Sequence, residues 1–262
     1  MHKIRKLLKA LGIIARKPYL LNLVLNTDEN WENFVRRNHP GFLSLPKVSL
    51  KSMLGESEAL VHPFSFLDGG SLPTDLAVLT GLAKQIPGCS YFEIGTWRGE
   101  SVANVSRVAA KCFTMDLPDQ EKRELGMTDA YIAQHAMLSH HLSNVTHLKA
   151  NSFHFDFTSL NQKFDLIFID GDHHYDALVN DTKRVFASLV HEKTIVVWHD
   201  YGYNPESIRY EVLAGILDGL DKVYHDKLYH VANTMCAVYL PEGATGTKED
   251  IPVFEIRMKI NG

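Results

Sequence analysis

The chain has 262 residues, 45% hydrophobic and 22% charged, an ordinary globular balance with room for one good-sized α/β domain. Its formal charge of −4 gives no sign of the basic surface that nucleic-acid-binding proteins carry, so no nucleic-acid partner is expected. The cysteines form no CxxC pair, which argues against a zinc knuckle or a disulfide scaffold and fits a reducing cytoplasm; they are Cys89, Cys112 and Cys236.

The first 25 residues differ in charge from the rest. No Asp or Glu precedes Asp28, whereas six basic residues occur: Lys3, Arg5, Lys6, Lys9, Arg16 and Lys17. Apolar residues at helical spacing predict a basic amphipathic helix that ends before Pro18; they are Ile4, Leu7, Leu8, Leu11 and Ile14. The apolar run 19–25 is too short to span a bilayer. The segment 1–25 fits a helix docked on the domain or on a second subunit, or a peripheral contact with an anionic membrane surface.

Residues 26–72 mix helical and loop-like stretches. Residues 29–37 look helical, and 38–53 is interrupted by prolines and a glycine and reads as a loop. A further helix is predicted from Pro73 to about Gln85. We therefore expect an N-terminal helical extension or lid over 1–70 and a second domain over 71–262.

After Gly88 the sequence alternates regularly between strands and helices. Short apolar runs predict strands over 90–95, 112–116, 145–151, 163–170 and 193–200. Helices are predicted between them and after the last, over 99–111, 129–142, 175–190 and 206–220. Two closing strands, 221–231 and 234–241, have no helix between them and are expected to be antiparallel. This order predicts an α/β fold with a mostly parallel sheet and helices on both faces.

Acidic residues stand at the ends of four predicted strands, where ligands bind in such sheets: Glu93, Asp116, Asp170 and Asp200. The loop after the first strand, "YFEIGTWRGES" (91–101), lacks the lysine of a phosphate-binding loop. It also fails the dinucleotide pattern GxGxxG, because Trp97 would block a pyrophosphate. A carboxylate at Glu93 would repel phosphate but suits S-adenosylmethionine, which carries a sulfonium and an ammonium group.

Four segments in order resemble the motifs of class I S-adenosylmethionine-dependent methyltransferases, closest to methyltransferase family 24: "YFEIGTWRGES", "CFTMDLPD", "KANSF" and "FDLIFIDGDHHYDALVNDTKR". The resemblance covers about residues 70–240 and implies a Rossmann-like seven-stranded sheet with the last strand antiparallel. It implies cofactor contacts to the methionine part by Glu93, Gly95, Thr96, Gly99 and Ser101. The ribose would meet Asp116 and Leu117, and the adenine Asn151 and Ser152. Asp170 is also a candidate cofactor residue, since without a metal it would close over the cofactor.

A second group of residues comes from "IDGDHHYD" and "VVWHDYG", which are similar to segments of macrocin-type sugar O-methyltransferases of macrolide and aminocoumarin pathways. That similarity implies magnesium ligands at Asp170 and Asp200 and a general base at Asp172. His199 departs from the pattern, which has Asp there, and imidazole favours softer ions, so the identity of the metal and the need for one stay open. Without a metal, Asp170 would cap the following helix and His199 would pair with Asp200.

Together these features predict methyl transfer to a hydroxyl of a small molecule or sugar, with S-adenosylmethionine as cofactor and a divalent metal at Asp170, His199 and Asp200. The catalytic candidates are Asp172, His173 and His199, and the acceptor pocket would also include Tyr175 and Tyr201. One alternative is a non-catalytic S-adenosylmethionine-binding accessory protein of glycan or lipid assembly. Another is an NAD-dependent oxidoreductase, since Asp116 would serve NAD equally well. A homo-oligomer in the cytoplasm is expected.

Overall fold

The computed structural model describes residues 2–18, 28–67, 69–246 and 254–259, and the chain forms two compact units, Met1–Leu43 and Ser44–Gly262. The first unit holds helices α1 (His2–Arg16) and α3 (Asp28–Asn38), as the apolar spacing predicts. Met1 and the run 19–25 lie outside the described residues. Among the residues that are described, no helix is long and apolar enough to cross a membrane.

The second unit is built on an eight-stranded sheet of order β1-β9-β10-β6-β5-β2-β3-β4. Its strands are β1 (Lys47–Val48), β2 (Ser90–Ile94), β3 (Lys111–Asp116), β4 (Val145–Lys149), β5 (Leu166–Ile169), β6 (Ile195–Trp198), β9 (Leu228–Val231) and β10 (Ala237–Tyr239). Strand β10 runs antiparallel to both neighbours, and the remaining pairs are parallel. The predicted fold class is confirmed, with β1 added at one edge as an eighth strand.

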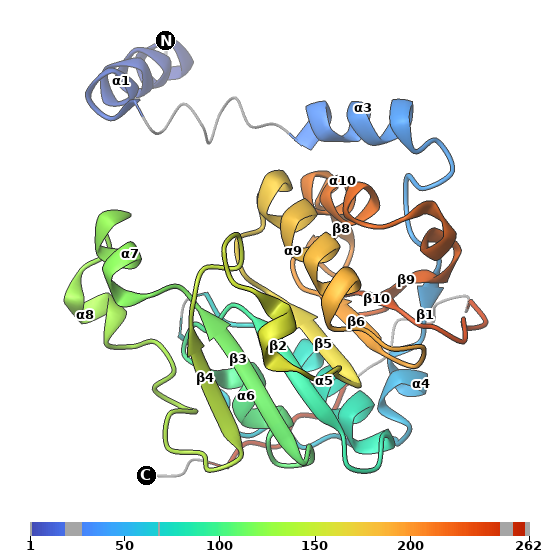
Figure 1. Ribbon diagram of the computed structural model, residues 1–262. Coiled ribbons are helices and arrows are strands. Elements are labelled where there is room, and N and C mark those ends of the chain that lie inside the picture. The colour runs from blue at the N-terminus through green and yellow to red at the C-terminus, as the bar shows by residue number, and fades with distance from the viewer. Residues whose placement is uncertain (1, 19–27, 68, 247–253, 260–262) are drawn as a thin grey trace. The chain divides into compact units, whose positions relative to one another are not determined.

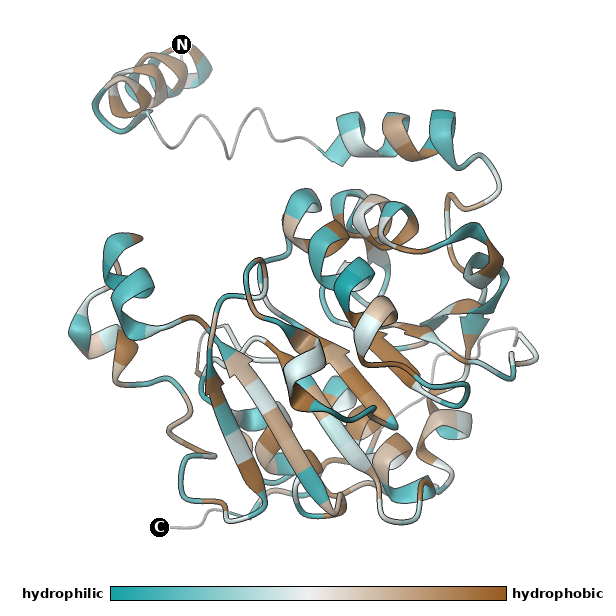
Figure 2. Ribbon diagram, in the orientation of Figure 1, coloured by the Kyte–Doolittle hydropathy of each residue, from teal (hydrophilic) through white to brown (hydrophobic). Residues whose placement is uncertain are grey.

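Helices cover both faces of this sheet (Figure 1). One face packs against α4 (Leu50–Leu54), α5 (Pro73–Gln85) and α6 (Glu100–Val105), and the other against α9 (Tyr175–Ser188) and α10 (Tyr210–Gly219). Central strands enclosed on both sides must be apolar throughout. Every residue of β5 is accordingly buried, and β5 and β6 are brown in Figure 2.

The boundary between the two units differs from the one expected near residue 70. The sheet unit begins at Ser44 because Lys47 and Val48 pair in parallel with β9. Val48, Leu50 and Met53 are buried in the same core. A two-residue strand carries too little apolar alternation to be recognised in the sequence.

Several predicted elements are shorter than expected, among them the helix over 99–111, which is reduced to α6 (Glu100–Val105). The strand over 221–231 is wrong in its first half: Lys222–Lys227 is a 3-10 helix, η3, in which His225 Nε2 caps the carbonyls of Leu217 (3.0 Å) and Leu220. The helix over 206–220 begins only at Tyr210, after a hairpin of β7 (Gly202–Asn204) and β8 (Ser207–Ile208). The helix over 129–142 is reduced to α8 (Asp129–Ile132), followed by turns.

Candidate cofactor and cation site

Glu93, near the end of β2, holds the loop between β2 and α6 through buried hydrogen bonds. This side chain is fully buried, and its carboxylate accepts hydrogen bonds from Tyr91 Oη (2.7 Å), Ser101 Oγ (2.8 Å) and Thr114 Oγ1 (2.6 Å). Burial raises the pKa of Glu93 to about 7, although these hydrogen bonds oppose the rise. Glu93 and Ser101 thus lie together, beneath the loop rather than on its surface.

Two glycines give the loop its shape. Gly95 has φ +103°, and a β-carbon there would overlap the main-chain carbonyl of Asp170 at the end of β5. Gly99 has φ +82° and begins α6, where a β-carbon would overlap the side chain of Ser139. Both positions therefore require glycine, and Gly95 brings the cofactor loop into direct contact with the next strand end.

Asp116, the expected ribose ligand, ends β3 and is held by three cationic or polar partners. Its Oδ2 accepts from Lys122 Nζ, from His135 Nδ1 (3.0 Å) and from Lys149 Nζ (3.3 Å). Burial raises the pKa of Asp116, but the hydrogen bonds from His135 and Lys122 outweigh it and hold the pKa below its ordinary value. All three contacts go to Oδ2 rather than to Oδ1.

The segment that follows α7 (Asp119–Glu124) packs onto the cofactor loop. The main-chain N–H groups of Ala136 and Leu138 donate to the carbonyls of Trp97 (2.7 Å) and Arg98 (2.9 Å). The Trp97 ring stacks on Tyr131, 4.2 Å between centroids. These tertiary hydrogen bonds replace the i→i−4 bonds of a longer helix, which explains why α8 is short.

The remaining expected cofactor residues lie along neighbouring strand ends. Thr96 is buried, and its carbonyl accepts from His135 Nδ1 (2.8 Å). Leu117 follows Asp116 and is partly exposed. Asn151 donates to Glu121 Oε2 (2.6 Å), while Ser152 hydrogen-bonds Asp181 on α9.

The ends of β5 and β6 bring together the three residues expected to bind a metal. Ligand atoms of Asp170, His199 and Asp200 all lie within 4.8 Å of one another. His199 Nδ1 is 3.1 Å from Asp170 Oδ1 and 3.6 Å from Asp200 Oδ1. Its Nε2 faces Asp75 Oδ2 at 3.1 Å, and Asp75, at the start of α5, is completely buried. The imidazole is thus enclosed by three carboxylates.

This enclosure perturbs the protonation of the cluster. Burial would lower the pKa of His199, but the charge and hydrogen bond of Asp170, with those from Asp200 and Asp75, raise it well above its ordinary value. Burial raises the pKa of Asp170 despite the opposing charge of His199. Asp200 also adopts a left-handed backbone conformation, φ +55°, which is uncommon for a residue other than glycine and is typical of functional sites.

The expected catalytic and acceptor residues separate into two groups. His173 is 42% exposed, with its Nδ1 3.6 Å from Asp200 Oδ2, and so lies beside the cluster. Asp172 instead accepts from the main chain of His174 (3.0 Å) and also contacts its ring. Tyr201 is buried, and its Oη accepts from the Leu45 N–H (3.1 Å), so it is not exposed for an acceptor. Tyr175 directs its hydroxyl to Asp218 (2.5 Å).

Comparison with known proteins bears on this site directly. Residues 92–201, which run from β2 to the end of the acidic cluster, match the family model of a methyltransferase domain, Methyltransf_24. This segment therefore resembles the methyltransferase domain of that family. The resemblance read from the motifs is confirmed. No curated protein sequence matches the chain.

Solved structures similar to this chain differ widely in what their names say they act on. They include the methyltransferase PaMTH1 of Podospora anserina with bound SAH (15% identity, TM-score 0.48, 72% of this chain and 92% of that one). The calicheamicin methyltransferase CalS11 has 11% identity and TM-score 0.45 over 63% and 77% of the two chains. A ribosomal protein L11 methylase of Lactobacillus delbrueckii subsp. bulgaricus has 14% identity and TM-score 0.40 over 74% and 93%. At these values the likeness concerns the outline of the fold and not the substrate.

Some residues of the candidate site could not be found in the sequence. Asp75 is 124 positions from His199 and reads as a helix-capping residue, a role it also fills by accepting from the Leu72 N–H (2.8 Å). Lys122 stands in the charged run "DQEKRE" yet is buried against Asp116. The sequence offers one indication of the role of Lys122: it lies only six residues after Asp116, at the end of the second predicted strand.

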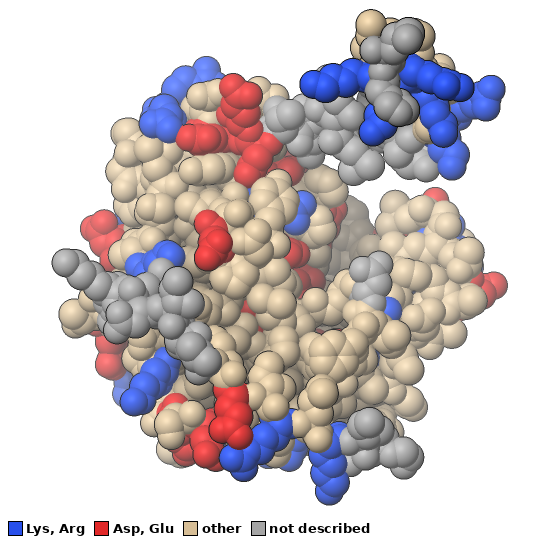
Figure 3. Space-filling view, turned by 180° about the vertical axis from the view of Figure 1, so that it is seen from behind, with Lys and Arg blue, Asp and Glu red and all other residues tan. Residues whose placement is uncertain are grey.

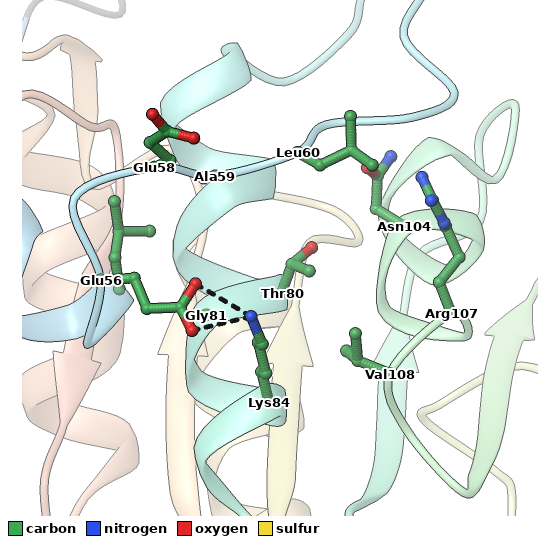
Figure 4. A pocket seen from close by; sticks show the side chains of 11 residues that line it. Glu56, Glu58, Ala59, Leu60, Thr80, Gly81, Lys84, Asn104, Arg107 and Val108 are labelled. Carbon is green, nitrogen blue, oxygen red and sulfur yellow. Dashed lines mark hydrogen bonds and ion pairs between the residues drawn. The ribbon is translucent and has the colours of Figure 1, made fainter.

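A separate cavity of about 480 Å³ lies between α4, α5 and α6 (Figure 4). Its charged residues are partly paired, since Lys84 Nζ bonds both oxygens of Glu56 (2.8 and 2.9 Å). Asn104, in α6, and Arg107, in the turn that follows α6, also line it. None of its lining residues belongs to the motifs of the cofactor loop or the acidic cluster.

Proposed function

We propose that the protein transfers the methyl group of S-adenosylmethionine to a hydroxyl group of a small molecule or sugar. The contact between the Gly95 turn and the Asp170 carbonyl carries this proposal, because it joins the cofactor loop to the acidic cluster. A methyl donor on the loop and a hydroxyl at the cluster would then be neighbours, as in-line transfer requires.

For the cofactor, the loop glycines would turn main-chain N–H groups toward the methionine part, while Glu93 and Ser101 hold the loop from beneath. Asp116 would accept the ribose hydroxyls through Oδ1, beside Leu117. Asn151 and Ser152 would border the adenine. Trp97 and Tyr131 would help to exclude water from the site by fixing the covering segment on the loop.

The acidic cluster fits a divalent cation. Its donor set is one imidazole nitrogen and two carboxylates, and Asp75 on Nε2 would fix the tautomer that turns Nδ1 toward Asp170 and Asp200. When bound, such an ion lowers the pKa of a hydroxyl that coordinates it. Three carboxylates around a single imidazole also leave the cluster with an excess of negative charge for a cation to balance.

His173 is our choice of proton acceptor. Its half-exposed ring stands beside the cluster, whereas His199 is enclosed and Asp172 already bonds the main chain of His174. The hydroxyl oxygen would form a bond to the methyl carbon as the carbon–sulfur bond breaks, leaving S-adenosylhomocysteine. The hydroxyl proton would pass to His173.

Isothermal titration of the protein with S-adenosylhomocysteine, with and without Mg²⁺ or Mn²⁺ and with NAD as the control ligand, tests the proposal. We expect binding of S-adenosylhomocysteine and none of NAD. The double variant Asp170→Asn, Asp200→Asn should abolish any heat from the metal alone. Preferential binding of NAD would contradict the cofactor assignment, and an equal metal signal from the double variant would contradict the cation site.

A further inference from the structure

The surface of α1 is divided into an apolar and a basic sector. At about 100° per residue, Ile4, Leu7, Leu8, Leu11 and Ile14 fall within a sector about 120° wide. The five basic residues of α1 all lie outside that sector. Ile4, Leu7, Leu8 and Leu11 are 53–67% exposed, and Figure 2 shows brown and teal residues along the helix. Within its own unit the helix thus presents an exposed apolar stripe, which a protein surface rarely carries without a partner.

The charge of this segment is opposite to that of the rest of the chain. Residues 1–17 carry six Lys and Arg and no Asp or Glu, a formal charge of +6. The other 245 residues hold 21 basic and 31 acidic residues, a charge of −10. In Figure 3, α1 shows blue and tan atoms. Pairing with residues 1–17 of a second copy would bring six positive charges against six, so the complementary partner is an apolar surface that carries negative charge.

We propose that α1 lies on an anionic lipid bilayer, with its apolar sector among the upper acyl chains and its basic residues among the headgroups. Fifteen residues extend about 22 Å, less than the roughly 30 Å of the hydrocarbon core, so the helix lies in the plane of the membrane surface. Apolar insertion and headgroup attraction act together in such helices. This attachment is independent of the proposed methyl transfer.

The test is co-sedimentation of the full-length protein with vesicles of phosphatidylcholine alone or mixed with phosphatidylglycerol. One double variant, Leu7→Gln with Leu11→Gln, removes apolar surface but no charge. A second, Lys6→Gln with Lys9→Gln, removes charge but no apolar surface. The control, Lys193→Gln with Lys222→Gln, deletes two exposed lysines from the sheet unit. Titration with S-adenosylhomocysteine, run on every variant, verifies that the sheet unit is folded.

We expect binding to the mixed vesicles that weakens with salt, and little binding to phosphatidylcholine alone. The leucine variant should bind about tenfold more weakly or worse, and the lysine variant about fivefold more weakly per lysine, with the control unchanged. Absence of vesicle binding by the wild type, or unchanged binding by the leucine variant, overturns the proposal. A dimer that the leucine substitutions dissociate, without vesicle binding, would assign the apolar sector to a second copy of the chain instead.

Discussion

Replacing Glu93 by glutamine should stabilise the protein at alkaline pH. The carboxyl is fully buried among three hydroxyl groups, and its pKa rises from 4.5 to about 7 on folding. Because the folded pKa is the higher one, the contribution of Glu93 to stability is complete below pH 4.5 and is lost as the pH rises through 7. A shift of this size corresponds to about 3 kcal/mol. Glutamine keeps the shape of the side chain, and the neighbouring hydroxyls can rotate to accept from its amide.

The free energy of unfolding of Glu93→Gln should therefore exceed that of the wild type at pH 8 by up to about 3 kcal/mol, and the difference should shrink by about 2 kcal/mol at pH 5.5. For a unit of this size, 3 kcal/mol is roughly 6–12 °C in Tm. Urea denaturation at both pH values measures it, with the exposed Glu206→Gln as the matched control. If Glu93→Gln is no more stable than the wild type at pH 8, or the difference does not vary with pH, the buried position assigned to Glu93 is wrong.

Three further substitutions test other contacts. Asp75→Asn removes the charge of a fully buried carboxylate from its imidazole partner, and should lower the free energy of unfolding, measured by urea denaturation, by about 3 kcal/mol. The same change at the exposed Asp129 should have no measurable effect. Equal losses of stability in the two variants would contradict the pairing of Asp75 with His199. Gly95→Ala should lower the melting temperature far more than Gly88→Ala. Both glycines have positive φ, but only at position 95 would a β-carbon overlap main-chain atoms. Similar melting temperatures of the two variants would refute this expectation. Asp116→Ala should weaken S-adenosylhomocysteine binding by about tenfold or more in titration calorimetry, while unchanged affinity would exclude its ribose contact.

The sequence predicts those parts of the fold that depend on local pattern. The run at 166–169 is apolar throughout because it is enclosed on both faces, and it was recognisable as a buried strand for that reason. The bounds of α5 follow from Pro73 in its first turn. Glycines at 95 and 99 marked the cofactor loop, since only glycine readily adopts their positive φ.

What the sequence could not predict depends on distant contacts or on which face a side chain takes. In a strand buried on both faces, alternation does not tell whether Glu93 points to the cofactor or beneath the loop. Asp75 meets His199 only because the fold brings the first turn of α5 next to the residue that follows β6, 124 positions away. The segment after Ile132 has a helical sequence, but its N–H groups bond the cofactor loop instead.

The charge balance of the site gives a physical reason for a cationic cofactor. Asp75, Asp170 and Asp200 surround the single imidazole of His199, and the Asp170 carbonyl lies against the Gly95 turn, so this excess negative charge stands next to the cofactor loop. In the proposed reaction the sulfonium of S-adenosylmethionine becomes a neutral thioether. The attraction between cluster and cofactor therefore falls once the methyl group has left, because opposite charges attract strongly only at short range and away from bulk water. The carboxylates that favour binding of the methyl donor would thus favour its replacement after transfer, without any change in the shape of the site. A divalent cation bound at the cluster would balance part of this negative charge, so the effect is largest when no metal is bound.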